Sequence, residues 1–140
     1  MNEPDLAWSL LRSARTIAVV GYSLRPDRPS NSVSAYLRRH GYRVIPVNPQ
    51  LHGAIVEGER GYDRLADIPR SEQIDLVDVF RRGEFLDDVV DDALARGLTA
   101  MWFQLGLGNV DAAHRAEAAG IRVVWDRCTA IEHRRMRAEE

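Results

Sequence analysis

Hydroxyl and guanidinium groups gather in the stretch VVGYSLRPDRPSNSV, which spans residues 19–33. They belong to Ser23, Ser30, Ser32, Arg25 and Arg28. Such groups donate hydrogen bonds to anions, and the first N–H groups of a helix that begins in this stretch add partial positive charge. Pro26 and Pro29 restrict the backbone, so less conformational entropy is lost when an anion orders it. The stretch therefore predicts a phosphate site.

A plainer interpretation of the same stretch stays open, in which Ser30 or Ser32 only caps the helix and the arginines are solvated. A second basic pair, Arg81 and Arg82, directly follows another apolar run. We expect this pair at the same sheet edge as the first loop, where charge-assisted bonds of about 1.5–3 kcal/mol each would select a phosphorylated ligand. The coincidence of two basic loops favours a ligand with several phosphates.

The glycine pattern of a dinucleotide site is incomplete. Gly21 allows a tight exit from the first strand, but Ser23 stands where G-x-G-x-x-G needs its second glycine. The second predicted strand ends in Asn48 and Pro49, whereas an NAD site normally has Asp or Glu there to hold the ribose. Both departures count against NAD, although a small Rossmann-type enzyme or binding protein that uses NAD or another nucleotide stays the alternative.

Apolar runs alternate with helical patterns along the chain. The runs predict strands at residues 16–21, 42–49, 74–80, 99–106 and 121–126. Helical spacing predicts helices at about 6–14, 32–40, 62–67, 84–96 and 110–119, and another from about 130. This succession predicts an α/β, Rossmann-like three-layer fold: a five-stranded parallel sheet in the order 3-2-1-4-5 with helices on both faces. Ligands would bind beyond the carboxyl ends of its strands, in loops 21–32, 48–49, 80–84, 104–109 and 126–132.

Length and composition exclude several classes of protein. A chain of 140 residues predicts one domain, residues 1–140, and its formal charge of −2 argues against nucleic-acid or membrane partners. All 19 basic residues are arginine, which excludes a Schiff-base lysine and a Walker phosphate loop. A single cysteine, with neither a signal pattern nor a membrane-spanning apolar run, predicts a cytoplasmic protein.

Histidines offer little for catalysis. His40, His52, His114 and His133 show no metal-ligand spacing and no adjacent nucleophile. We therefore expect no metal site and no catalytic residues, which favours a binding protein over an enzyme.

Four segments together resemble a known family: VVGYSLRPDRPSNSVSAYLRRHGYRVIPVNP, DLVDVFRR, MWFQLGL and VVWDRCTAIEH. They are similar to the small stand-alone coenzyme A-binding domain proteins, whose Rossmann-like domain also resembles the CoA-binding domain of the succinyl-CoA synthetase α subunit. The resemblance implies CoA or an acyl-CoA as the ligand, held by a non-catalytic carrier, sensor or regulatory module. It implies as binding residues Gly21, Tyr22, Ser23, Arg28, Ser30, Asn48, Pro49, Phe80, Arg81, Arg82, Gln104 and Gly106.

Cys128 follows the last predicted strand and could reach the same edge of the sheet. A cysteine at a helix N-terminus beside Arg127 should have a lowered pKa. CoA ends in a thiol, so we expect that oxidation can join it to Cys128 in a mixed disulfide. The alternative is a buried, inert cysteine. An exposed apolar helix would also allow a homodimer.

Overall fold

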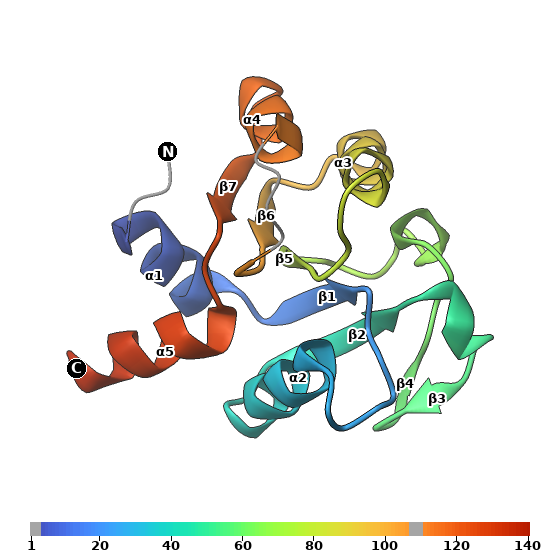
Figure 1. The fold of residues 1–140 in the computed structure, drawn as a ribbon, viewed down its shortest axis with the longest axis horizontal. Coiled ribbons are helices and arrows are strands. Elements are labelled where there is room, and N and C mark those ends of the chain that lie inside the picture. Colours follow the sequence, from blue (N-terminus) through green and yellow to red (C-terminus); the bar gives the residue numbers. More distant parts are fainter. Residues whose placement is uncertain (1–3, 107–110) are drawn as a thin grey trace.

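A computed structural model of the chain describes residues 4–106 and 111–140. Five parallel strands form one sheet in the order β2-β1-β5-β6-β7 (Figure 1). Their bounds are β1 Thr16–Val20, β2 Arg43–Val47, β5 Leu76–Val79, β6 Ala100–Phe103 and β7 Arg122–Trp125. A separate antiparallel pair, β3 Ile55–Val56 with β4 Glu59–Arg60, lies in the connection after β2. The predicted class, a parallel sheet between helices, is confirmed.

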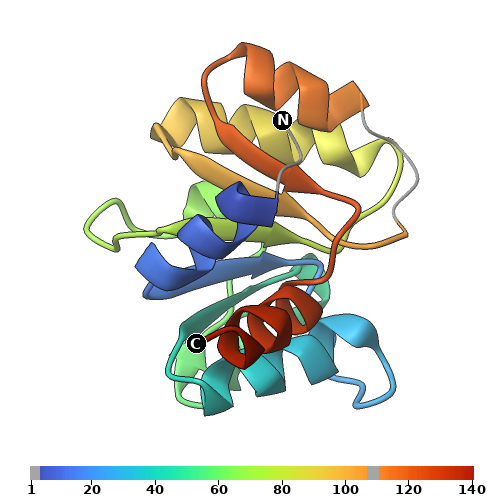
Figure 2. The same ribbon diagram turned by 90° about the vertical axis from the view of Figure 1, so that its left-hand side faces the viewer.

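Helices cover both faces of the sheet. They are α1 Pro4–Ser13, α2 Pro29–Arg39, α3 Phe85–Arg96, α4 Asp111–Ala118 and α5 Thr129–Ala138. Figures 1 and 2 show α1, α2 and α5 on one face and α3 and α4 on the other. Successive residues of β1 point to opposite faces, so Ile17 packs with the first set of helices and Ala18 with the second. Both faces are apolar, which explains the continuous apolar runs of the sequence.

The predicted strand order is wrong. Counted along the chain, the five strands lie in the order 2-1-3-4-5 instead of 3-2-1-4-5, because β5 pairs in parallel with β1 on the side opposite β2. The connection from β2 to β5 packs Leu65 and Ile68 into the apolar cluster that contains the inward residues of α3. It therefore crosses the face opposite α2. Because parallel connections are right-handed, a crossover on that face runs along the sheet in the direction opposite to the crossover through α2, and it carries the chain back past β1.

Predicted element boundaries hold to within a few residues. Each predicted sheet strand contains one observed strand, but α2 begins earlier than predicted, because Pro29 occupies its first position without a lost hydrogen bond. The predicted helix at 62–67 is only a 3₁₀ turn, Leu65–Asp67. The predicted helix start at Val110 and the loop residues 107–109 lie outside the described residues. Within residues 4–106 and 111–140, no helix has both the length and the apolar character needed to span a membrane.

Candidate functional site

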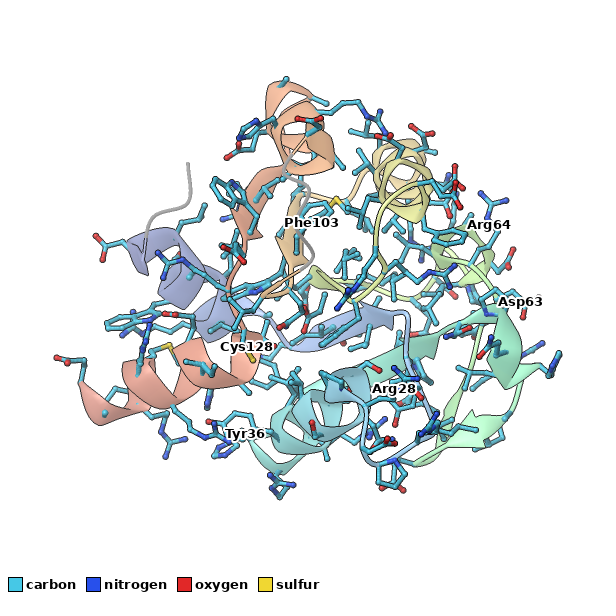
Figure 3. All side chains as sticks on the ribbon, in the orientation of Figure 1. Arg28, Tyr36, Asp63, Arg64, Phe103 and Cys128 are labelled. Atoms are coloured by element: carbon cyan, nitrogen blue, oxygen red, sulfur yellow. The ribbon has the colours of Figure 1, made fainter. Side chains whose placement is uncertain are left out.

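A cleft of about 560 Å³ opens where β1, β5 and β6 end. The connection after β1 leads through α2 to β2, and the connection after β5 leads through α3 to β6 in the opposite direction along the sheet. The gap between β1 and β5 is therefore the switch point at which open α/β sheets bind ligands. Figure 3 labels Arg28 at the start of α2 and Cys128 at the start of α5, on two walls of the cleft. The cleft brings together these residues singled out from the sequence: Gly21, Ser23, Arg25, Arg28, Ser30, Phe80, Arg82, Gln104 and Cys128.

Gly21 shapes the exit from β1. Its φ of 88° lies in the left-handed region, and a Cβ atom there would stand 3.2 Å from the carbonyl carbon of Phe80. Both the backbone conformation and the close approach of the turn after β5 require a glycine. The two loops can therefore meet at the base of the cleft.

Serines hold the loop after β1 in shape. The Ser30 hydroxyl accepts a hydrogen bond from the Ser23 amide at 3.0 Å, and the Ser23 hydroxyl accepts one from the Arg25 amide at 3.1 Å. The side-chain amide of Asn31 donates to the Ser23 carbonyl at 2.9 Å. These bonds supply locally the order that glycines and close backbone packing supply in a dinucleotide loop.

Arginines make the cleft cationic. Arg25, Arg28 and Arg82 line it, and its described lining contains no carboxylate. Arg25 pairs with the exposed Asp27 at 3.0 Å, whereas Arg28 and Arg82 form no ion pair with any described residue. Arg28 is the N-cap of α2, and within the described ranges no side chain caps this helix. The interpretation of Ser30 or Ser32 as the cap is therefore wrong, because the helix begins before them at Pro29.

A buried polar group lies beneath the floor of the cleft. The side-chain nitrogen of Gln104 donates to Asp78 Oδ1 at 2.8 Å and to the Thr129 hydroxyl at 2.9 Å. That hydroxyl donates to Asp78 Oδ2 at 2.9 Å. Burial raises the pKa of Asp78 to about 7, although the hydrogen bonds from Gln104 and Thr129 act in the opposite direction. A proton on Asp78 thus exchanges near neutral pH, directly under the cleft.

Cys128 is the N-cap of α5 and lines the cleft, half-buried. Burial raises the pKa of its thiol, and the backbone amides of Ile131 and Ala130 offset this only in part. The predicted lowering of the Cys128 pKa is therefore wrong, since desolvation outweighs the favourable helix terminus. The position predicted for Cys128 agrees with the structure; its reactivity stays a prediction.

Tyr22 and Asn48 do not line the cleft. The Tyr22 ring is 2% exposed and packs in the core, where its hydroxyl accepts a hydrogen bond from Arg38 at 3.1 Å. The Asn48 side chain is used internally: it donates to the Tyr22 carbonyl at 3.0 Å and accepts from the Gln50 amide at 3.0 Å. Both residues therefore brace the loop after β1 instead of facing the cavity.

Arg81 and Pro49 line a second cavity of about 240 Å³ on the α3 face. Arg81 stacks over the ring of Phe85 at 4.1 Å. Consecutive residues of an extended chain point to opposite faces, so Arg81 and Arg82 separate at the end of β5. Gly106 lies outside both linings, and its amide donates to Asp126 at 3.1 Å.

Sequence reasoning missed part of the cleft. Val33, Gln50, Leu105 and Ile131 line it but were not among the predicted binding residues. Asp78 and Thr129, under the floor, were missed as well. A signal existed for Asp78, because an acidic residue inside the apolar run LVDVF is unusual unless it is paired or functional.

Two of the histidines meet behind the cleft, between α2 and α5. The Tyr36 hydroxyl lies 2.8 Å from Nδ1 of the buried His133, and the rings of His40 and His133 are 4.9 Å apart. Burial lowers the pKa of His133, and the neighbouring His40 adds to the effect. This cluster joins α5 to α2.

Known proteins resemble the chain in sequence and in fold. Residues 15–134 match the family model described as "CoA binding domain". The uncharacterized protein YneT of Bacillus subtilis (strain 168) is 38% identical over 124 residues, which are 89% of this chain and 89% of that protein. The solved structure of cell-free ID.343 from Thermus thermophilus has 38% identity and a TM-score of 0.87, covering 96% of this chain and 98% of that one.

A larger protein contains a similar part. The dinucleotide forming acetyl-coenzyme A synthetase 1 of Ca. Korarchaeum cryptofilum, solved in complex with phosphate and ADP, has 25% identity and a TM-score of 0.67. The match covers 88% of this chain and 27% of that chain. The likeness thus extends to one segment of a multi-part enzyme.

Proposed function

The chain belongs to the CoA binding domain family, and on that premise we propose that its cleft binds coenzyme A or an acyl-CoA. In this proposal the protein acts as a non-catalytic carrier, sensor or regulatory module. CoA joins several phosphates to a long arm of amide and apolar groups that ends in a thiol. A protein that binds it needs cationic groups and apolar surface in one cavity.

The composition of the cleft carries the proposal. Two arginines without an ion-pair partner among the described residues, Arg28 and Arg82, and the start of α2 suit the phosphates. The apolar side chains of Val33, Leu105 and Ile131 suit the arm. Asn48 argues against NAD, since its amide stands where a carboxylate would hold ribose and is already bonded within the chain.

The lining also supports a non-catalytic role. Among its described residues, the cleft presents arginines and one thiol of raised pKa, with no imidazole or carboxylate at its surface. General acid–base catalysis of acyl transfer would need such a group within hydrogen-bond reach. If the role is non-catalytic, acetyl-CoA incubated with the protein is recovered intact by mass spectrometry. Release of free CoA faster than in a buffer blank would contradict it.

Native mass spectrometry of the freshly purified protein tests the ligand class, because a retained mass matching CoA identifies it. Titration calorimetry adds the comparison: we expect CoA to bind at least tenfold more tightly than NAD, a difference of about 1.4 kcal/mol. Equal or reversed affinities would overturn the proposal. Light scattering of the same samples tests whether the protein forms the homodimer that an exposed apolar helix would allow.

A further inference from the structure

The floor of the cleft holds one glutamine whose two ends have different surroundings. Gln104 is 4% exposed and lines the cleft, while Asp78 and Thr129 beneath it are both 0% exposed. The Gln104 side-chain nitrogen points at these two residues, with distances of 2.8 Å to Asp78 and 2.9 Å to Thr129. Both of its N–H groups are therefore used below the floor.

Hydrogen-bonding capacity fixes this orientation. An ionised carboxylate only accepts, so Asp78 requires a donor from each neighbour. Thr129 has one hydroxyl proton, and Asp78 Oδ2 receives it at 2.9 Å. Gln104 must supply the other donor, which leaves its carbonyl oxygen Oε1 on the side of the cleft. Within the described part of the chain, no residue donates to that oxygen.

We propose that Gln104 Oε1 is the acceptor in the cleft that recognises a secondary-amide N–H of the ligand, and that Asp78 and Thr129 are positioning residues that hold it there. The assignment rests on the proposed function, because the pantetheine arm of CoA carries two secondary amides. A buried acceptor facing a bound arm costs free energy when left unpaired, so it selects an arm with a donor over one without. A bound arm would also cover the apolar neighbours Phe80, Leu105 and Ile131, and it would displace the water that could otherwise replace the donor.

Two ligands separate the arm from the nucleotide. Adenosine 3′-phosphate 5′-diphosphate is CoA without its pantetheine arm, so it keeps the phosphates and lacks the amides. For Gln104→Met, we expect the Kd for CoA to rise about tenfold and the Kd for the truncated nucleotide to stay within twofold. Gln73→Met is the matched control, since Gln73 also donates to an aspartate, Asp75, at 2.9 Å but lies in an exposed turn before β5. It should change neither Kd.

Variants of the positioning residues keep the proposal testable if Gln104→Met fails to fold. Asp78→Asn keeps the shape but lets the Gln104 amide turn over, so the Kd for CoA alone should rise about threefold at pH 8. Thr129→Val should do the same, and Thr129→Ser, which keeps the hydroxyl, should restore tight binding.

The outcomes distinguish a failure of CoA binding from a failure of the role assigned to Gln104. If wild-type protein binds neither ligand, the proposed function fails, and the role of Gln104 fails with it. If wild-type protein binds CoA but Gln104→Met or Asp78→Asn weakens both ligands equally or neither, CoA binding stands and the role of Gln104 is overturned.

Discussion

An aspartate lies near each end of the segment that contains β5, and the pKa values of the two are shifted in opposite directions. Asp75, before the strand, accepts hydrogen bonds from the backbone amides of Arg15 and Thr16, both at 2.9 Å, and from Gln73. Its partial burial would raise the pKa, but these bonds outweigh it and the pKa is lowered. Asp78, near the carboxyl end, is fully buried with only side-chain donors, and its pKa is raised to about 7.

This difference separates structural from functional demands on one sheet. At the amino edge, backbone amides solvate the Asp75 carboxylate, so the charge joins β1 to the start of β5 and stabilises the fold. At the carboxyl edge, the Asp78 carboxylate lies under the cleft without a countercharge among the described residues and destabilises the fold when ionised. A buried carboxylate without a countercharge is unfavourable for folding, and here it lies where a ligand is expected to bind, as is usual for functional sites.

Replacing Asp78 should have the largest effect on the comparison. The native state holds one proton more than the unfolded state between pH 4 and 7, so wild-type stability should fall as the pH rises through this window, by up to about 4 kcal/mol. In Asp78→Asn this loss should disappear. Urea unfolding at pH 5 and pH 8 measures both slopes; equal slopes in the two proteins would mean that Asp78 titrates normally.

Replacing arginines at the carboxyl edge of the sheet should change ligand affinity, whereas replacing one at the amino edge should change stability. Arg28→Ala and Arg82→Ala, at the carboxyl edge, should each weaken CoA binding by roughly 1.5–3 kcal/mol with little change in Tm. Arg43 at the amino edge bonds Glu59 at 2.8 Å and Glu72 at 2.6 Å. Arg43→Ala should lower stability by up to about 1 kcal/mol and leave CoA affinity unchanged. Normal CoA binding by both cleft variants would place the ligand elsewhere.

Asp75→Asn should show the opposite pH dependence to Asp78→Asn, with a smaller effect. Because the pKa of Asp75 is lowered on folding, its contribution is present above the unfolded value near 4 and is lost as the pH falls through the folded value. We expect a destabilisation of about 1 kcal/mol at pH 7 that shrinks toward pH 2. Urea unfolding at both pH values checks this, and a gap that widened in acid would reverse the assigned sign.

Cys128 should give the smallest and slowest change. Its thiolate would attack the disulfide of oxidised CoA, forming a protein–CoA disulfide and releasing one CoA thiolate. With a raised pKa, the adduct should form slowly at pH 7 and about tenfold faster per pH unit up to pH 9. Intact mass with and without reductant follows it, and Cys128→Ser should show none. Rapid modification at pH 6 would indicate a lowered pKa instead.

Most of the fold could be predicted because buried parallel strands are apolar runs and each helix shows its own spacing. The strand order could not, since the same succession of elements fits both orders. The choice depends on which face the connection after β2 crosses, and Leu65 and Ile68 decide that only by their tertiary packing.

Some residues of the candidate site could be predicted from the sequence, and others depend on tertiary structure. The loop residues Arg28 and Ser30 follow from their place after β1, and the structure puts both in the cleft lining. The separation of Arg81 from Arg82 depends on the last extended residue of β5, which sequence locates only to within a few positions. The family resemblance implies that Tyr22 contacts the ligand, but its ring lies in the core, and the direction of the backbone at a left-handed glycine is not visible in a sequence.

The position of α5 determines when the cleft is complete during synthesis and folding of the chain. Cys128 and Ile131 form its last wall, and every other lining residue precedes them in the sequence. On a ribosome, the sheet strands and α2 emerge first, while the cavity stays open on one side until α5 has left the exit tunnel and packed against α1 and α2. A ligand that binds only the finished cavity stabilises only the finished state. It therefore stabilises only molecules in which α5 has already packed, and it does not stabilise the earlier state with an open cavity.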